Sequence, residues 1–252
     1  MSNFLIDSYQ FPTALSDEGL KAYWKFDEAS GDIINDSESD DSLGSAANLQ
    51  VTGATYQQGS PPLSNGLSFD GTNDFAVAGT SLSQFNFLHN SATMTWSICW
   101  WMKKLAGIDA DGILGTCPNP SSGIGLIMRL RTTASIAPKI YNSAAGGVLG
   151  LDGTNNFIPD NTNWYFYIAT YDQSLASNNF KITRDNGNLY QGSKTGNAPT
   201  TSNATDAYTI GAQADESNFF NAIYCEMSVW DRVLTAGEQT QLYNGGSGKA
   251  IY

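Results

Sequence analysis

Apolar and polar residues alternate strictly from Thr93 to Lys103. One side of this alternation is wholly apolar and consists of Met94, Trp96, Ile98, Trp100 and Met102. A period of two is typical of a β-strand, and aromatic and β-branched residues suit its pleated surface. The other side is mixed and includes Trp101. Because edge strands usually carry charged residues and charge appears here only at the end, the pattern predicts a strand in the middle of its sheet.

Shorter stretches repeat this pattern along the chain. The first spans residues 19–28 and has an inward side of Leu20, Ala22, Trp24 and Phe26. Residues 67–77 predict two strands joined by the turn-rich segment Asp70–Asp74, and Asn186-Gly187 predicts a hairpin within residues 180–190. Residues 163–172 are apolar on both sides, so we expect that strand to be covered on both. Further short strands are predicted at 112–116, 125–131, 139–142, 208–212 and 223–230.

One segment reads as a helix, Thr235–Asn244. Thr235 and Glu238 have the spacing of a capping box, and Gly245 follows as a stop signal. Many short strands, glycine-rich turns and a single short helix are typical of an all-β sandwich. We therefore predict an all-β sandwich over residues 19–252, with no linker that divides it.

The N-terminal residues 1–18 do not alternate and are expected to form a separate arm. The segment carries five large apolar residues, Phe4, Leu5, Ile6, Tyr9 and Phe11. A freely disordered tail is usually poor in such residues, so we predict that the arm lies on a surface, its own or a partner's. It lacks the basic and long apolar regions of a secretory signal, and no window approaches the roughly 18 consecutive apolar residues of a membrane span.

Composition excludes one class of partner. Charged residues make up only 14% of the chain, the formal net charge is −12, and there is a single histidine. Such a surface repels phosphate backbones, so we expect no nucleic-acid partner. The three cysteines are too few for a disulfide framework; one disulfide pair stays open beside the alternative of three buried thiols.

Several segments, in order, resemble the laminin G-like branch of the concanavalin A-like lectin/glucanase superfamily. They are GLKAYWKFDEASG, GLSFDGTNDFAV, MTWSICWWMKK, NWYFYIATYD, ITRDNGNLY, YTIGAQ and the closing FFNAIYCEMSVWDRVLTAGEQTQLYNGG, and together they span roughly residues 19–246. The resemblance implies that residues 19–252 form a jelly roll of two curved antiparallel sheets. It also implies a binding or structural module, of the kind found in secreted proteins and phage particles.

The resemblance also implies a calcium ion between the first and last strands. The positions that match are Asp27 and Glu28 after the first strand and Glu226 in the last. Cys225 stands where relatives carry an acid, and a thiolate is a poor ligand for a hard cation. Glu226 replaces that acid only if the strand is irregular there, because adjacent strand residues point to opposite faces. The alternative of three solvated acids and no ion stays open.

Catalytic motifs are absent from the sequence. The glucanase relatives use a strand with the pattern E-x-D-x-x-E, and here Glu38-Ser39-Asp40 begins it but Leu43 stands at the third acid. We therefore expect no enzyme. Candidate sugar-binding aromatic and amide residues occur in or beside loops at Tyr141-Asn142, Asn163-Trp164 and Phe219-Phe220-Asn221, without a defined glycan site.

These observations predict a non-catalytic structural or attachment protein at a virion surface, of the phage decoration or tail-fibre type. Its expected partners are other particle proteins, through residues 1–18, and cell-surface glycans. A homo-oligomeric or assembly-bound state is expected, at a virion surface or outside a cell. A free carbohydrate-binding lectin module is the alternative, and a glycoside hydrolase comes third.

Overall fold

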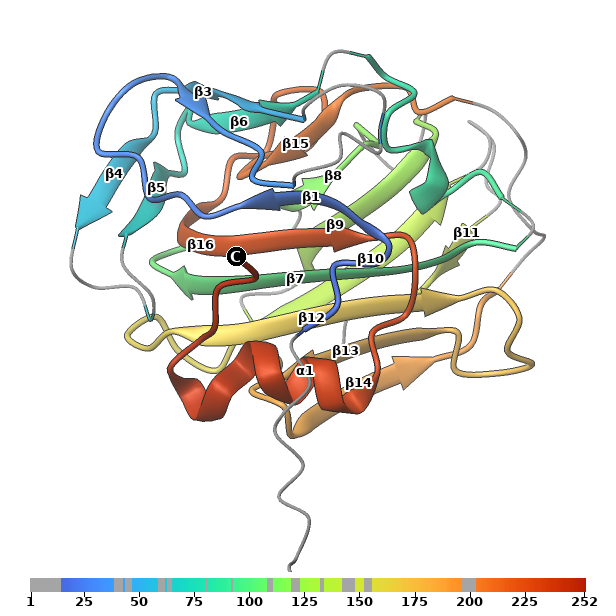
Figure 1. Ribbon diagram of the computed structural model, residues 1–252. Coiled ribbons are helices and arrows are strands. Elements are labelled where there is room, and N and C mark those ends of the chain that lie inside the picture. Colours follow the sequence, from blue (N-terminus) through green and yellow to red (C-terminus); the bar gives the residue numbers. More distant parts are fainter. Residues whose placement is uncertain are drawn as a thin grey trace, which may run out of the picture.

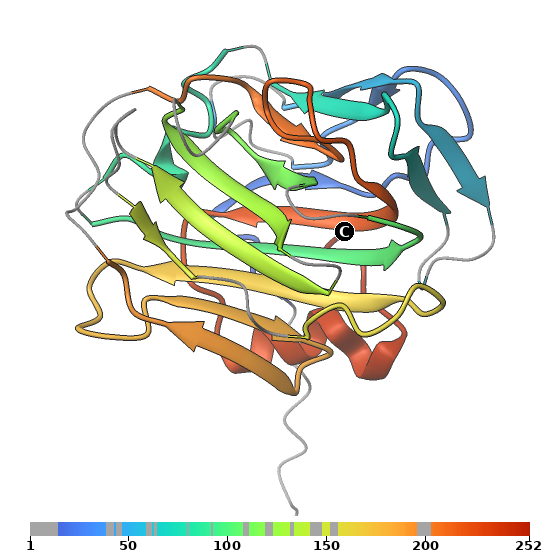
Figure 2. The same ribbon diagram turned by 180° about the vertical axis from the view of Figure 1, so that it is seen from behind.

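Two antiparallel β-sheets pack face to face in the computed structural model, and one short helix covers the outer face of one of them (Figures 1 and 2). The structure describes residues 15–252 except 39–42, 44–46, 59–61, 63–64, 80, 92, 108–110, 119–122, 132–133, 142–147, 152–155 and 196–202. The predicted all-β jelly-roll class is confirmed.

The first sheet, sheet A, has the order β14-β13-β12-β7-β16-β5-β4, and β1 pairs with β16 on the same side as β5. Its strands are β1 (Leu20–Trp24), β4 (Thr55–Gln58), β5 (Asn65–Asp70), β7 (Thr95–Lys104), β12 (Tyr165–Asp172), β13 (Phe180–Arg184), β14 (Asn188–Gly192) and β16 (Asn221–Trp230). The central position predicted for the strand around Trp100 is confirmed, because β7 lies between β12 and β16.

The second sheet, sheet B, has the order β11-β10-β9-β8-β15-β6-β3-β2. Its strands are β2 (Ile33–Ile34), β3 (Leu49–Thr52), β6 (Phe75–Ala78), β8 (Gly112–Gly115), β9 (Gly125–Arg131), β10 (Ser135–Tyr141), β11 (Val148–Gly150) and β15 (Tyr208–Ile210). A 3₁₀ turn, η1 (Asn86–Leu88), lies before β7, and a second, η2 (Asn244–Gly246), follows the helix.

The two sides of β7 enter two different cores. Its wholly apolar side lies between the sheets, where Trp100 stacks on Tyr167 with ring centroids 5.4 Å apart. Its other side carries Cys99 and Trp101 into a second core on the outer face of sheet A, beneath the helix α1 (Ala236–Tyr243). The two-sided burial of sheet A explains why β7 and β12 are apolar on both faces.

Trp101 holds α1 onto the sheet through aromatic contacts. Its ring centroid lies 5.1 Å from that of Phe166 and 6.0 Å from that of Tyr243, near the end of α1. The predicted capping box is present. The side-chain oxygen of Thr235 accepts from the main-chain N–H of Glu238, and the carboxylate of Glu238 accepts from the main-chain N–H of Thr235. Asn244 rather than Gly245 takes the left-handed cap position, with φ 48°.

The inward side predicted for β1 is wrong at one residue. Ala22, Trp24 and Phe26 enter the core between the sheets, but Leu20 lies in the second core with Tyr23. A β-bulge between Leu20 and Ala22 shifts the register against β16, so residues on either side of it no longer keep the strict alternation. The predicted hairpin is confirmed, although its left-handed residues are Asp185 and Asn186 rather than Asn186 and Gly187.

Most of the predicted N-terminal arm, residues 1–14, lies outside the described residues. Its last four residues contact the domain itself: Leu15 packs against the second core, and Arg232 donates to the carbonyls of Ser16 and Glu18. All three cysteines are buried free thiols, as one of the two interpretations expected. Among the described residues, no helix is long and apolar enough to cross a membrane.

Candidate functional site

A hollow of about 230 Å³ opens at the end of the sandwich where β5 ends, β7 ends and β16 begins. In Figure 1 this end of β7 and β16 lies at the left of sheet A. Segments far apart in the sequence meet there, because Asn221 pairs with Asp70 across β16 and β5. Its walls combine two carboxylates, an amide, an aromatic ring and small residues: Asp70, Gly71, Ala106, Gly107, Asp111, Phe219 and Asn221.

Asn221 is the central residue of this hollow. Its main-chain carbonyl accepts from the N–H groups of Leu105, at 2.9 Å, and Ala106, at 3.1 Å, which ties the end of β7 to the start of β16. Its side-chain Oδ1 is buried and accepts no hydrogen bond from the described part of the chain. A buried polar atom without a partner costs about 1–3 kcal/mol, so a residue that lines the hollow carries an acceptor that the described part of the chain leaves unsatisfied.

Two glycines keep the hollow open. Gly71 has φ +76°, which favours glycine, and a Cβ there would lie 2.8 Å from the Cβ of Asn221. At Gly107 a Cβ would lie 2.8 Å from Cε2 of Phe220. A larger side chain at Gly71 meets Asn221, which lines the hollow, whereas one at Gly107 meets Phe220 and Leu130 in the core between the sheets. Both glycines therefore permit the close approach of the β5–β6 turn and the end of β7 to their neighbours.

The hollow has an aromatic wall and an acidic one. Phe219 is half-buried, and its ring centroid lies 6.3 Å from that of Phe75. Asp70 is exposed at the end of β5, with Oδ1 accepting from the N–H of Thr72 at 2.7 Å, whereas Asp111 is buried just before β8. An apolar surface beside a few fixed polar groups is the usual composition of a small-molecule site.

Only some of the residues that the sequence suggested for sugar binding line the hollow. Phe219 and Asn221 reach the hollow, but Phe220 belongs to the core between the sheets. Tyr141 is buried in a small cluster with Cys117 and Ile127, and Asn142 lies outside the described residues.

The remaining pair, Asn163-Trp164, does not contribute to the hollow. The side-chain amide of Asn163 donates to Asp160, and Trp164 packs against the second core. Sequence reasoning missed Asp70, Asp111, Ala106 and Gly107 as site residues, because only the pairing of β5, β7 and β16 brings them together.

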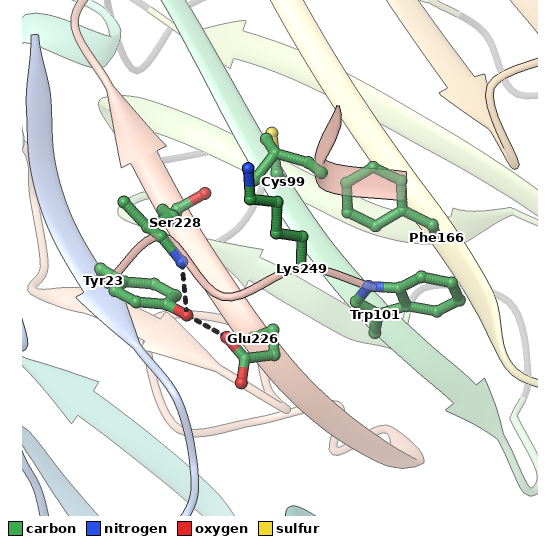
Figure 3. A pocket seen from close by; sticks show the side chains of 9 residues that line it. Tyr23, Cys99, Trp101, Phe166, Glu226, Ser228 and Lys249 are labelled. Atoms are coloured by element: carbon green, nitrogen blue, oxygen red, sulfur yellow. Dashed lines mark hydrogen bonds between the residues drawn. The ribbon is translucent and has the colours of Figure 1, made fainter. Parts of the chain in front are cut away.

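Glu226, predicted as a calcium ligand, lies in a different place. A register shift between Cys225 and Ser228 and a φ of 49° at Glu226 mark a β-bulge, so the strand is irregular there, as a ligand role required. The carboxylate, however, is directed at the hydroxyl of Tyr23, which donates to it (Figure 3). The cavity beside this pair, also lined by Lys249 and Ile251, measures only about 10 Å³, the size of one water.

The other two predicted calcium ligands do not converge on Glu226. Oε1 of Glu28 accepts from the main-chain N–H of Asn35 at 2.8 Å and from its side-chain amide at 3.3 Å. Asp27 lies near enough to raise the pKa of Glu226 through its charge. Across the residues that the structure describes, no group of three or more His, Cys, Asp or Glu side chains is placed to hold a metal ion. The three acids therefore do not fit a calcium site, and calcium binding stays a prediction.

Thermal melts test that prediction. If the ion binds the folded state, millimolar calcium raises the melting temperature relative to chelator. The free energy of unfolding then rises by about 2.7 kcal/mol at a hundredfold excess over the dissociation constant. From the geometry of Glu28 and Glu226 we expect nearly identical melts in calcium and in chelator. A calcium-dependent shift that disappears in Asp27→Ala would instead place an ion at these residues.

The buried Glu226 predicts a pH dependence of stability. Burial, and secondarily the charge of Asp27, raises its pKa from 4.5 to about 7, while Tyr23 and Lys25 oppose the shift. Between these values the folded chain holds the proton and the unfolded chain releases it, so stability falls as pH rises from about 4.5 through 7. We expect the melting temperature of the wild type to fall more between pH 5 and pH 8 than that of Glu226→Gln. Parallel pH profiles would contradict this assignment.

Comparison with known proteins agrees with this architecture. The family described as "Concanavalin A-like lectin/glucanases superfamily" matches residues 70–238. No curated protein matches the sequence. Among solved structures, the binding domain of Paraclostridial Mosquitocidal Protein 1 is 16% identical, with a TM-score of 0.61 over 90% of this chain and 52% of that one.

Two further solved structures carry sugars in their descriptions. The binding domain of Botulinum Neurotoxin DC in complex with SialylT is 13% identical, with a TM-score of 0.60 over 90% of this chain and 52% of that one. Trypanosoma rangeli sialidase in complex with sialic acid is 14% identical, with a TM-score of 0.60 over 92% of this chain and 34% of that one. The chain thus spans about half of these binding domains and a third of the sialidase, and these similarities establish the fold alone.

Proposed function

This chain belongs to the concanavalin A-like lectin/glucanase superfamily, and we propose that it is a non-catalytic attachment module that binds glycans in the hollow at the start of β16. The observation that carries the proposal is the unsatisfied Oδ1 of Asn221, buried beside the half-exposed ring of Phe219. A sugar offers both complements at once, because its hydroxyls donate hydrogen bonds and its C–H face packs on an aromatic ring.

The dimensions of the hollow support a small ligand. Its volume of about 230 Å³ lies below the roughly 300–1,000 Å³ of sites that enclose drug-sized molecules. It therefore suits one terminal sugar ring, with the rest of the glycan outside. Two proteins that contain this fold were solved with sialic acid or SialylT, and the similarity covers about a third and about half of their chains, so they support sugar binding by proteins of this kind without transferring their ligands to this chain.

The proposal excludes catalysis on the grounds of chemistry. A glycosidase needs two carboxyl groups that flank the scissile bond, one of them held protonated. In the hollow, Asp70 lies at the exposed end of β5 and its Oδ1 accepts from the N–H of Thr72, so this carboxyl group is held by the main chain of its own turn rather than offered to a scissile bond. Release of reducing ends from the glycans that bind the protein would contradict this part of the proposal.

A glycan array with the purified chain tests binding itself. We expect a defined subset of glycans to be retained by the wild type and lost by the double variant Phe219→Ala/Asn221→Ala. Retention of the same glycans by the double variant would show that the binding site lies elsewhere. An array with no bound glycan would overturn glycan binding as the function.

We also propose that the protein acts at a virion surface, and this role rests on the apolar sequence of residues 1–18. We expect deletion of residues 1–14 to leave the melting temperature within about 2 °C, since single-domain stability comes from the core, while assembly or co-purification with virions is lost. Unfolding of the truncated chain would show that the arm belongs to its own core. An unchanged assembly state and unchanged co-purification would remove the particle role.

A further inference from the structure

The charge of the hollow bears on which sugars it accepts. Seven described residues line it; two of them are aspartates, contributed by the end of β5 and the segment before β8, and none of the seven is a lysine, arginine or histidine. Lys103 and Lys104 precede Ala106 in the chain, yet neither lines the hollow. On the part of the wall that the structure describes, a ligand therefore meets carboxylates and no lysine, arginine or histidine.

More acids lie around this end of the molecule. The turn at residues 213–217 is fixed beside the hollow, because the carbonyl of Asn218 accepts from the N–H of Gly112 at 2.8 Å, and it carries Asp215 and Glu216. Behind Asp70, Asp74 accepts from the N–H of Asp70 at 2.9 Å. The whole chain has a formal net charge of −12, so the background potential has the same sign as the hollow.

We infer that the hollow selects uncharged sugars and rejects those that carry a carboxylate, such as uronic and sialic acids. This inference rests on the proposed glycan binding. A sugar carboxylate placed close to one of these aspartates is repelled by it, and the repulsion is stronger in a partly enclosed site than in open water. Neutral sugars avoid this repulsion, and their hydroxyls donate hydrogen bonds to the same aspartates and to Oδ1 of Asn221.

The exclusion separates this chain from the two similar structures solved with sialic acid or SialylT, which share its fold. Those ligands carry a carboxylate, and a site that receives one usually presents arginine or backbone N–H donors to it. The walls of this hollow carry acceptors instead. Similarity of fold does not carry those ligands to this hollow, because one fold hosts many functions.

Matched sugar pairs test the inference, because a hexose and its uronic acid differ only at C6. The probes are glycans ending in galactose, glucose or mannose and the same glycans ending in the corresponding uronic acids, with affinities from isothermal titration calorimetry at 50 mM and 500 mM salt. We expect the uronic acid of each bound pair to bind at least tenfold more weakly at low salt, and this ratio to shrink at high salt through screening.

The variant Asp70→Asn removes one charge while keeping a side chain that suits the turn and can still bond a hydroxyl. We expect it to narrow the ratio between its affinities for the neutral sugar and for the uronic acid, and this ratio is compared within the variant, so any change in its affinity for the neutral sugar does not enter the test. Equal or tighter binding of the uronic acids by the wild type would overturn the inference and leave glycan binding intact. A ratio unaffected by salt and by Asp70→Asn would also overturn it, whereas no binding of either sugar would overturn the proposed function itself.

Discussion

Replacing Trp101 with alanine is expected to lower the free energy of unfolding by about 3–5 kcal/mol, the usual cost of truncating a buried tryptophan. Trp101 is only 3% exposed and contacts both Phe166 on β12 and Tyr243 at the end of α1. The substitution leaves a cavity in the core beneath α1 and removes the contacts that hold the helix on sheet A. In a chain of 252 residues this loss corresponds to a fall of roughly 10 °C in melting temperature.

Chemical denaturation monitored by tryptophan fluorescence and by circular dichroism measures the loss. The control is Leu189→Ala on the edge strand β14, where the side chain is 54% exposed and truncation is expected to change stability by no more than about 0.5 kcal/mol. A loss below about 1 kcal/mol for Trp101→Ala would mean that α1 does not cover this face of the sheet.

Asn221→Ala is expected to weaken glycan binding at least tenfold without destabilising the fold. The loss of binding follows because its Oδ1 is the buried acceptor offered to a sugar hydroxyl, and tenfold corresponds to about 1.4 kcal/mol. The fold is expected to stay as stable or to gain stability, because the substitution removes a buried oxygen without a partner while the main-chain bonds to Leu105 and Ala106 remain.

Measuring glycan affinity and melting temperature together distinguishes a binding residue from a structural one. Asn188→Ala, an exposed asparagine at the start of β14, is the matched control and should change neither binding nor stability. If Asn221→Ala lowers the melting temperature by several degrees, Oδ1 has a structural partner and the assignment of the hollow fails. Unchanged affinity with unchanged stability would equally contradict it.

Local patterns in the sequence predict most of sheet A and the helix. Strict alternation identifies β7, and the Thr235–Glu238 spacing identifies the capped start of α1, because both depend only on neighbours along the chain. The two-residue β2 is too short to show any period, and the four-residue β3 and β4 are also not predicted, although strands as short as β8 and β15 are. The bulge that moves Leu20 to the second core depends on pairing with β16, which local sequence does not encode.

The candidate site depends even more on distant pairing. Phe219-Phe220-Asn221 is recognisable in the sequence as an aromatic and amide segment, but its neighbour Asp70 lies about 150 residues earlier and meets it only through the register of β5 and β16. For the acids predicted to bind calcium, the sequence suggested a site that the geometry does not form. Glu226 sits in the irregular strand that its role required, yet burial directs its carboxylate to the hydroxyl of Tyr23.

The most direct test of glycan binding in the hollow is a titration of the isotope-labelled chain with a neutral glycan retained on the array, followed by NMR of the backbone amides. We predict that the largest chemical-shift changes fall on Gly71, Ala106, Gly107 and Asn221, whose amides surround the hollow, while Asn188 and Leu189 on β14 stay unchanged. Shift changes that spare these four amides and cluster on another part of the sandwich would contradict the assignment.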